Sequence, residues 1–362
     1  MKKFLNIIFY TSIIIFFGCE ESNDPIVGED HFLNYEVESV PVTQDYDLGA
    51  FYFSGNFDPD FVEEPTLGRY NPADGDPGIY NSHIEMAKQA GIDFFIHSMR
   101  TSAFGSTGYQ IDSTIVANLM QAPNASDVDF ALSYNFAFMQ LGNNNRVDDP
   151  SFDKVPLVLN DFENMKHFFN MPNYKRVNGK ALVYINNGAF LFANDNKAVY
   201  DAIRSAMNAD GIELYIIGEQ PEWTPPLRYD FRFVGGVDAV SHNSYITVTR
   251  NSIDRLLLFE QYVDQALTIA KNDLEQIGLE YIPQVSPSYN VTYVNPNNGN
   301  FIVEKDEESF RTFCDIAQKA SSENRIILVN SFNNWNFDTQ VEPAQSYGSK
   351  YLDILRDEFK VN

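Results

Sequence analysis

The 362-residue sequence is poor in basic residues and in cysteine, and both shortages limit what the chain can be. Its 25 Lys and Arg stand against 50 Asp and Glu, a formal net charge of −25. Nucleic-acid binding requires basic surface that neutralises phosphates, so this charge argues against a nucleic-acid partner. The 2 cysteines are Cys19 and Cys314. Because Cys19 belongs to a processing signal, Cys314 has no partner for a disulfide, and we expect a buried, inert thiol.

Several motifs for metal, nucleotide and hydrolase chemistry are also missing. The 5 histidines are scattered, without the H-x-x-x-H pairing that suits zinc. The acidic stretch 58–76 does not follow the spacing of an EF-hand loop. No Gly-rich phosphate loop and no G-x-S-x-G elbow follows a strand. We therefore expect no metal and no cofactor, and a Ser-His-Asp hydrolase is disfavoured.

The first 18 residues are typical of a secretory signal peptide. Two lysines precede an apolar run, residues 4–17, which is too short to span a bilayer comfortably. Gly18 directly before Cys19 is typical of a bacterial lipoprotein cleavage site. This pattern predicts that Cys19 is lipidated and becomes the mature N-terminus. The alternative is an ordinary membrane anchor with an incidental cysteine.

The residues after Cys19 suggest where the protein is held. Glu20 and Glu21 resemble the export signal of surface lipoproteins in Bacteroidetes-like bacteria. The stretch 19–46 is polar, acidic and without clear periodicity, which predicts a tether between membrane and domain. We therefore expect an outer-membrane lipoprotein exposed at the cell surface.

From residue 47 onward, strand-like segments alternate with helix-like segments. Strands are expected at 48–53, 92–97, 128–134, 180–185, 212–218, 237–241, 281–285 (interrupted by Pro283) and 325–330. Helices are expected at 81–90, with Asn81 as the N-cap, and at 113–120, 160–169, 197–208, 252–276, 306–319 and 344–359. This alternation predicts an α/β fold, a (β/α)8 TIM barrel with enlarged loops over residues 47–362. A doubly wound open sheet is the alternative, but its usual nucleotide-binding loop is missing.

Aromatic and amide side chains gather after the predicted strands, where barrel enzymes place their sites. The expected substrate-binding residues are Tyr52, Arg100, Tyr134, Asn135, Trp223, His242, Tyr245, Tyr289, Asn333, Asn334, Trp335 and Gln340. Sugars present apolar faces that stack on rings and hydroxyl groups that need fixed donors and acceptors. This composition therefore suits a carbohydrate, although aromatic residues can also simply cover a barrel mouth.

Five stretches carry family-like motifs: Ala50-Phe51-Tyr52-Phe53, then 83–96, 173–185, 281–289 and 331–343. Together they resemble glycoside hydrolase family 99, the endo-α-mannosidase and endo-mannanase family of retaining barrels, and the related WbsX-like proteins of polysaccharide loci. The last stretch is the most specific. It reads S-F-N-N-W-N-F-D-T-Q-V-E-P and is similar to the family's S-F-N-E-W-H-E-G-T-Q-I-E-P.

The departures from this pattern bear on catalysis. The resemblance implies two glutamates in the last motif, but Asn334 and Phe337 occupy their positions, and Asn336 stands at the family histidine. A further carboxylate expected after the third strand has no counterpart. Glycoside cleavage needs an acid that protonates the leaving oxygen and a second group that assists. Neither an amide nor a phenyl ring can transfer that proton.

The sequence therefore predicts a surface-anchored carbohydrate-binding protein on a glycosidase-like barrel, a pseudoenzyme with respect to family-type catalysis. Its expected partners are a glycan such as a mannan and the membrane, through lipid on Cys19. The alternative is an active endo-α-mannosidase-like or mannanase-like hydrolase that uses relocated acids, Asp338, Glu219 or Glu342. Of these, Glu342 is also expected to be structural, because an acid near the start of the last helix suits its dipole.

Overall fold

Strands and helices alternate along the part of the chain that the computed structural model describes, namely residues 35–57, 63–104, 106–136, 139, 146–220, 230–244, 259–292, 294–297 and 302–361. The strands are β1 (Asp47–Tyr52), β2 (Phe94–Arg100), β3 (Asp129–Asn135), β4 (Arg176–Val177), β5 (Lys180–Asn186), β6 (Leu214–Gln220), β7 (Ala239–His242), β8 (Glu280–Ile282), β9 (Gln284–Val285) and β10 (Ile326–Val329). The helices are α1 (Pro77–Ala90), α2 (Ser106–Leu119), α3 (Val155–Phe169), α4 (Asn196–Asn208), α5 (Asp230–Phe233), α7 (Phe259–Gln276), α8 (Glu307–Ala320) and α9 (Lys350–Phe359).

The sheet is a parallel ring with the strand order β8-β7-β6-β5-β3-β2-β1-β10-β9. Pro283 separates β8 from β9, and the two halves pair with different neighbours, β8 with β7 and β9 with β10. They therefore act as one interrupted strand that closes the ring. Only β4 lies off this path, in an antiparallel hairpin with β5. The predicted (β/α)8 barrel, including its break at Pro283, is confirmed.

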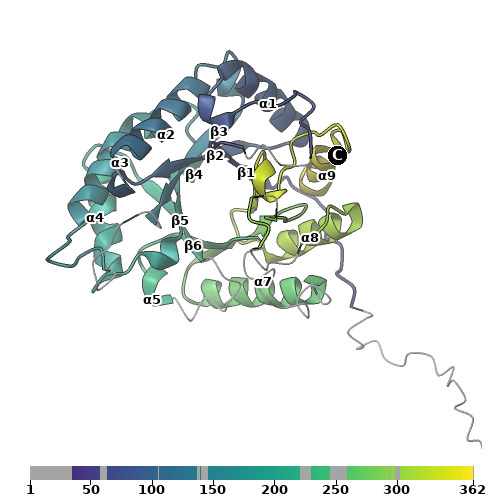
Figure 1. The fold of residues 1–362 in the computed structure, drawn as a ribbon. Helices are drawn as coiled ribbons and strands as arrows, with labels where there is room; N and C mark the ends of the chain where they lie inside the picture. The colour runs from purple at the N-terminus through teal and green to yellow at the C-terminus, as the bar shows by residue number, and fades with distance from the viewer. Residues whose placement is uncertain are drawn as a thin grey trace, which may run out of the picture. The chain divides into compact units, whose positions relative to one another are not determined.

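Helices surround the ring of strands (Figure 1). Helix α1 begins at Pro77, earlier than expected, because Asp76 and not Asn81 is its N-cap. The Asp76 Oδ1 accepts a hydrogen bond from Gly78 N at 2.7 Å, and proline is well suited to the first helical position. The helix ends at Gly91, whose φ of 71° is readily adopted only by glycine.

The apolar core lies inside the ring and between the ring and its helices. All four residues of β10 are buried, as its continuous apolar run predicts. Cys314 on α8 is buried and free, and burial raises the pKa of its thiol well above the ordinary value. The expectation of a buried, unreactive cysteine is thus supported. In the described part of the chain, no helix has the length and apolar character needed to cross a bilayer.

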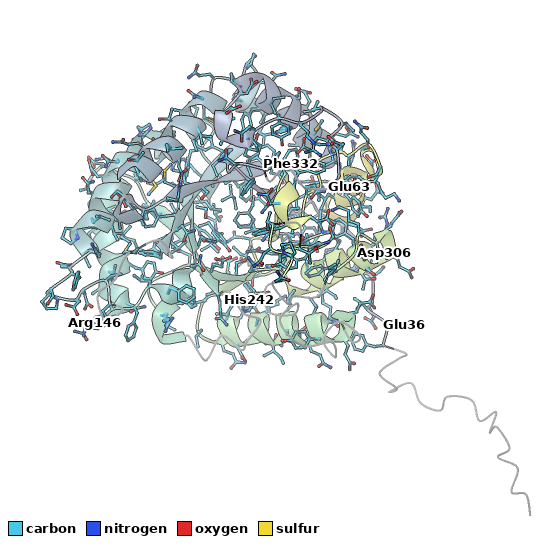
Figure 2. All side chains as sticks on the ribbon, viewed as in Figure 1. Glu36, Glu63, Arg146, His242, Asp306 and Phe332 are labelled. Atoms are coloured by element: carbon cyan, nitrogen blue, oxygen red, sulfur yellow. The ribbon has the colours of Figure 1, made fainter. Side chains whose placement is uncertain are left out.

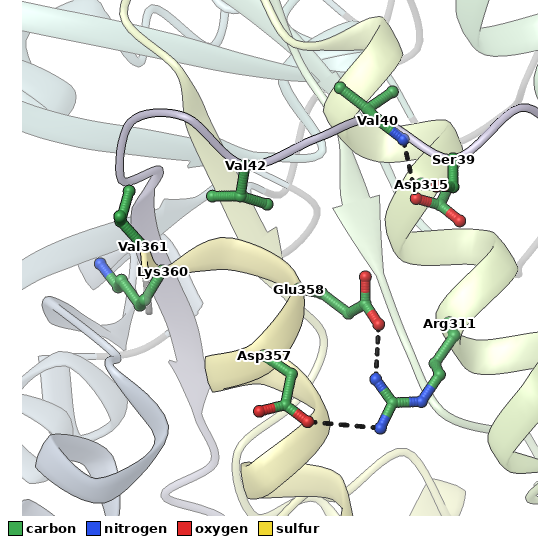
Figure 3. A pocket seen from close by; sticks show the side chains of 9 residues that line it. All are labelled: Ser39, Val40, Val42, Arg311, Asp315, Asp357, Glu358, Lys360 and Val361. Atoms are coloured by element: carbon green, nitrogen blue, oxygen red, sulfur yellow. Dashed lines mark hydrogen bonds and ion pairs between the residues drawn. The ribbon is translucent and has the colours of Figure 1, made fainter.

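The compact unit begins before the first strand, at Glu36, so the end of the predicted tether packs on the barrel. Val40 N donates to Asp315 Oδ1 on α8 at 3.2 Å. A polar surface pocket lies between this segment and helices α8 and α9 (Figure 3). Across it, Arg311 on α8 pairs with Glu358 on α9 at 2.5 Å.

Candidate functional site

Two contacts that cross the ring identify the side chains of the barrel interior. Phe51 on β1 and Tyr184 on β5 have ring centroids 4.9 Å apart, although β2 and β3 separate their strands in the sheet. Gln284 on β9 donates from Nε2 to the Tyr184 hydroxyl at 2.7 Å. Because side chains alternate along a strand, Asn186, two residues after Tyr184, also faces inward.

Side chains fill the centre of the ring (Figure 2), and many are polar. Gln284 Nε2 also donates to Ser241 Oγ on β7 at 3.1 Å, and its Oε1 accepts from Asn330 Nδ2 at 3.3 Å. The Tyr184 hydroxyl, which accepts from Gln284, donates its own hydrogen to Glu219 on β6. Every group in this series is thereby fixed in one orientation, as in other fully bonded buried networks.

Glu219 is the carboxylate of this interior, with only 3% of its surface exposed. Its Oε2 accepts from Asn186 Nδ2 and from the backbone N of Asn187, both at 2.7 Å. Tyr184 and Asn243 also donate to it. Burial raises the pKa of the carboxyl, and these hydrogen bonds oppose that rise. All of its described partners are neutral donors.

The interior is open to solvent above this network. Ser98 lies in the middle of β2 and faces inward, yet its side chain is exposed. Arg100 at the end of β2 is held by Asp112, which accepts from its Nη2 at 2.7 Å and from its Nε at 2.9 Å. Asn135, at the end of β3, accepts from Asn187 Nδ2 at 3.4 Å. The predicted residues Arg100 and Asn135 therefore lie at the strand ends, as expected.

Asp338, one predicted acid, is bound in an ion pair. Lys305, which lies before α8, donates from Nζ to Asp338 Oδ1, and also to Asp338 O and Ser288 Oγ at 2.8 Å each. The two charged side chains are only 11% and 15% exposed. Gln340 Nε2 adds a bond to Asp338 Oδ1 at 3.3 Å. The Asp338 carboxylate is therefore engaged in a largely buried ion pair.

Glu342, the second predicted acid, lies outside the ring in a buried cluster. Its Oε1 pairs with His83 Nε2 on α1 at 3.1 Å, and its Oε2 accepts from Tyr70 Oη and Trp335 Nε1 at 2.8 Å each. His83 Nδ1 contacts Tyr52 Oη at 3.0 Å. Glu342 and His83 are both 0% exposed. The cluster joins α1 to the segment after β10, which is a structural role, although Glu342 does not lie at the start of α9 as predicted.

The segment after β10 also holds the end of β1. Asn333 accepts from Phe53 N at 2.7 Å and donates to Phe53 O at 3.2 Å, so it binds that backbone as a neighbouring strand would. The Asn334 Oδ1 and Gln340 Oε1 are buried, and neither has a partner among the described residues. Phe337 is 41% exposed, and its ring lies 6.2 Å from that of Tyr289.

Four predicted contact residues point away from the interior. Tyr134 donates to Asp161 on α3 at 2.6 Å, and His242 contacts Tyr281 Oη at 3.0 Å. Tyr52 and Trp335 belong to the Glu342 cluster. For Tyr52, Tyr134 and His242 the reason is that neighbouring side chains of a strand lie on opposite faces of the sheet. Contact of these four residues with a substrate stays a prediction. Trp223, Tyr245 and Cys19 lie outside the described residues.

Several interior residues were not predicted. Asn186 and Asn187 directly follow a predicted strand, the same signal that identified Asn135. Gln284 is a polar residue within a predicted buried strand, which also marks it. No sequence pattern predicts the role of Lys305, because this residue lies in a connecting segment and contacts Asp338 only in the folded chain.

Comparison with known proteins agrees with this geometry. A family model described as Glycosyltransferase WbsX matches residues 53–355. A solved "Glycoside hydrolase-like protein" is 39% identical, with a TM-score of 0.84, over 92% of this chain and 99% of that one. The GH99 endo-α-mannosidase of Bacteroides thetaiotaomicron, in complex with bis-tris-propane, is 17% identical, with a TM-score of 0.62, over 88% of this chain and 98% of that one.

A more distant structure is the glycoside hydrolase family 5 mannosidase of Rhizomucor miehei. It is 10% identical, with a TM-score of 0.53, over 87% of this chain and 92% of that one. This structure and the endo-α-mannosidase share the barrel fold with the chain. No curated protein matches the chain.

Proposed function

Because the chain belongs to the family described as Glycosyltransferase WbsX and has a glycosidase-like barrel, we propose that it binds a glycan at the C-terminal ends of its strands without family 99-type cleavage. The family description and the names of the similar structures differ in reaction but share a carbohydrate ligand. That shared chemistry supports the choice of ligand. The interior of amides, hydroxyls and rings supports it independently.

The state of the three candidate acids carries the proposal. Asp338 is paired with Lys305, and Glu342 is 0% exposed in a cluster outside the ring. Of the three, only Glu219 faces the interior, among neutral donors. One carboxylate, with no second acid beside it among the described residues, suits binding better than the two-carboxylate chemistry of glycoside cleavage.

The residues at the family's glutamate positions agree with this view. Asn334 can offer a hydrogen-bond acceptor but no proton of useful acidity, and Phe337 offers only an apolar face. The exposed ring of Phe337 beside Tyr289 suits the apolar face of a sugar.

An active hydrolase is the second candidate, and one observation favours it. Burial raises the pKa of Glu219, which is what a general acid requires. A second assisting group would then have to come from Asp338 after it leaves Lys305, or from residues outside the described part. Glu342 would have to leave three hydrogen bonds to serve.

We also propose that lipid on Cys19 anchors the barrel at the cell surface. The support is the lipoprotein-type signal before Cys19, and the acidic residues after it. Metabolic labelling with an alkyne fatty acid should label the chain, and Cys19→Ala should lose the label. Protease treatment of intact cells should remove the chain if it is surface-exposed; a labelled chain that resists protease would place it on the inner leaflet.

The experiment that tests the function combines glycan binding with hydrolysis. The chain is probed on a glycan array and incubated with α-mannan, the first choice because a structural neighbour is named an endo-α-mannosidase. We expect saturable binding of at least one glycan and no release of reducing ends. Turnover that is lost in Glu219→Gln or in Asp338→Asn would instead establish the hydrolase. Failure to bind any glycan would reject both candidates.

A further inference from the structure

Two of the charged side chains that the structure describes at the strand ends are neutralised by ion pairs, whereas Glu219 is not. Arg100 is neutralised by Asp112 at 2.7 Å, and Lys305 is neutralised by Asp338. Glu219 has no cationic partner in the described part of the chain. Among the described residues, Glu219 is therefore a carboxyl group of the interior without a cationic partner.

The hydrogen bonds around Glu219 favour the carboxylate form. Asn187 N and Asn186 Nδ2 can only donate, and they share Oε2. The Tyr184 hydroxyl already accepts from Gln284, so its hydrogen points to Glu219. These donors stabilise the carboxylate form of Glu219, whereas burial acts in the opposite direction and raises the pKa of the carboxyl.

The rest of the molecule adds to the negative electrostatic potential around the site. The net charge of −25 repels anions at long range and attracts cations, an effect that salt screens. The effect of Glu219 is different, because a buried charge close to the ligand is screened far less by salt. Local and long-range fields can therefore be separated by experiment.

We propose that Glu219 selects the glycan by charge: the site takes sugars that are uncharged or carry a protonated amine, and rejects uronic acids and sulfated sugars. This inference rests on the proposed function and names its ligand class. A sugar ammonium group or hydroxyl dipole placed near Glu219 is attracted by its negative charge. A carboxylate or sulfate at the same place meets a like charge in a medium of low dielectric constant, which strongly disfavours binding.

The test is a glycan array of matched pairs that differ in one charged group, such as mannohexaose against mannuronate hexamer and glucosamine hexamer against its N-acetylated form. The full chain is probed at low salt and at about 1 M salt, where the screening length falls to about 3 Å. We expect acidic members to bind at least about tenfold more weakly than their neutral partners, with discrimination that persists at high salt.

Two variants separate Glu219 from its surroundings. Glu219→Gln should reduce the difference in affinity between neutral and acidic glycans by about tenfold. Asp161→Asn is the matched control, because Asp161 is also a 0% exposed carboxylate held by neutral donors, but on α3, outside the ring. Asp161→Asn should leave this difference in affinity unchanged.

The possible failures are distinguishable. Acidic glycans that bind as well as their neutral partners would overturn the inference and leave glycan binding intact. If Glu219→Gln kept the difference in affinity between neutral and acidic glycans, Glu219 would not be its cause. The same would follow if Asp161→Asn reduced that difference as much as Glu219→Gln does. If no glycan binds at all, the proposed function fails, and the inference fails with it.

Discussion

The ion pair between Lys305 and Asp338 gives the sharpest test of whether Asp338 is structural or catalytic. The two side chains are 11% and 15% exposed, and Lys305 is bonded to Asp338 twice, through the carboxylate and the backbone oxygen. Burial lowers the pKa of Lys305, and Asp338 opposes this shift. Asp338→Asn keeps the shape but leaves the buried ammonium group without its counter-charge.

We expect Asp338→Asn to lower the free energy of unfolding by about 3 kcal/mol, because an uncompensated buried charge typically costs about 3–5 kcal/mol. Lys305→Met should cost a similar amount. The double variant removes both charges and should recover to within about 1 kcal/mol of the parent chain. Urea unfolding followed by tryptophan fluorescence would measure this double-mutant cycle.

An exposed pair supplies the control. Lys197 and Asp201 lie 2.6 Å apart but are 54% and 49% exposed, so Asp201→Asn should change stability by less than about 1 kcal/mol. If the stability losses of Asp338→Asn and Lys305→Met simply added in the double variant, the energetic coupling between the two side chains would be refuted. Unchanged stability of Asp338→Asn with loss of an enzymatic turnover would show that Asp338 is catalytic.

Three further predictions follow from single residues. Burial raises the pKa of Glu219, so the folded chain binds the proton of this carboxyl more tightly than the unfolded chain does. As pH rises from about 4.5, the free energy of unfolding of the parent should therefore fall relative to that of Glu219→Gln, and the difference should become constant above the folded pKa. A difference in unfolding free energy that does not depend on pH would contradict this. Gly49→Ala should lower the free energy of unfolding by about 1–3 kcal/mol, because the added Cβ would lie 2.3 Å from the Phe94 ring. If urea unfolding gave this variant the same stability as the parent chain, that result would be evidence against this packing. In Cys19→Ala, Cys314 should resist thiol reagents until the chain unfolds, and rapid labelling of the folded chain would disprove its burial.

The strands and their order could be predicted because their apolar runs are continuous and alternate with helical patterns. Even the break at Pro283 was visible, since proline cannot donate within a sheet. The start of α1 was not, because Asp76-Pro77 lies in a stretch whose composition resembles a loop, while Asp76 is in fact its cap. Local composition could not separate a cap from a turn there.

The sequence predicts which residues lie at the strand ends, but not the direction in which their side chains point. Tyr52, Tyr134 and His242 stand at or near strand ends, yet their rings lie between sheet and helices. A shift of one residue along a strand changes the face on which a side chain lies. The partner of Asp338 depends on a connection that folds back over the strand ends, and no local pattern encodes that contact.

If this barrel binds a glycan without hydrolysing it, the glycan must survive prolonged contact with the protein. The direct measurement is mass spectrometry of an array-identified glycan after prolonged incubation with a stoichiometric amount of the chain, with Glu219→Gln in parallel. We expect the bound glycan to be recovered intact from both. Two shorter fragments produced by the parent chain, and not by Glu219→Gln, would contradict it and identify a hydrolase that uses Glu219.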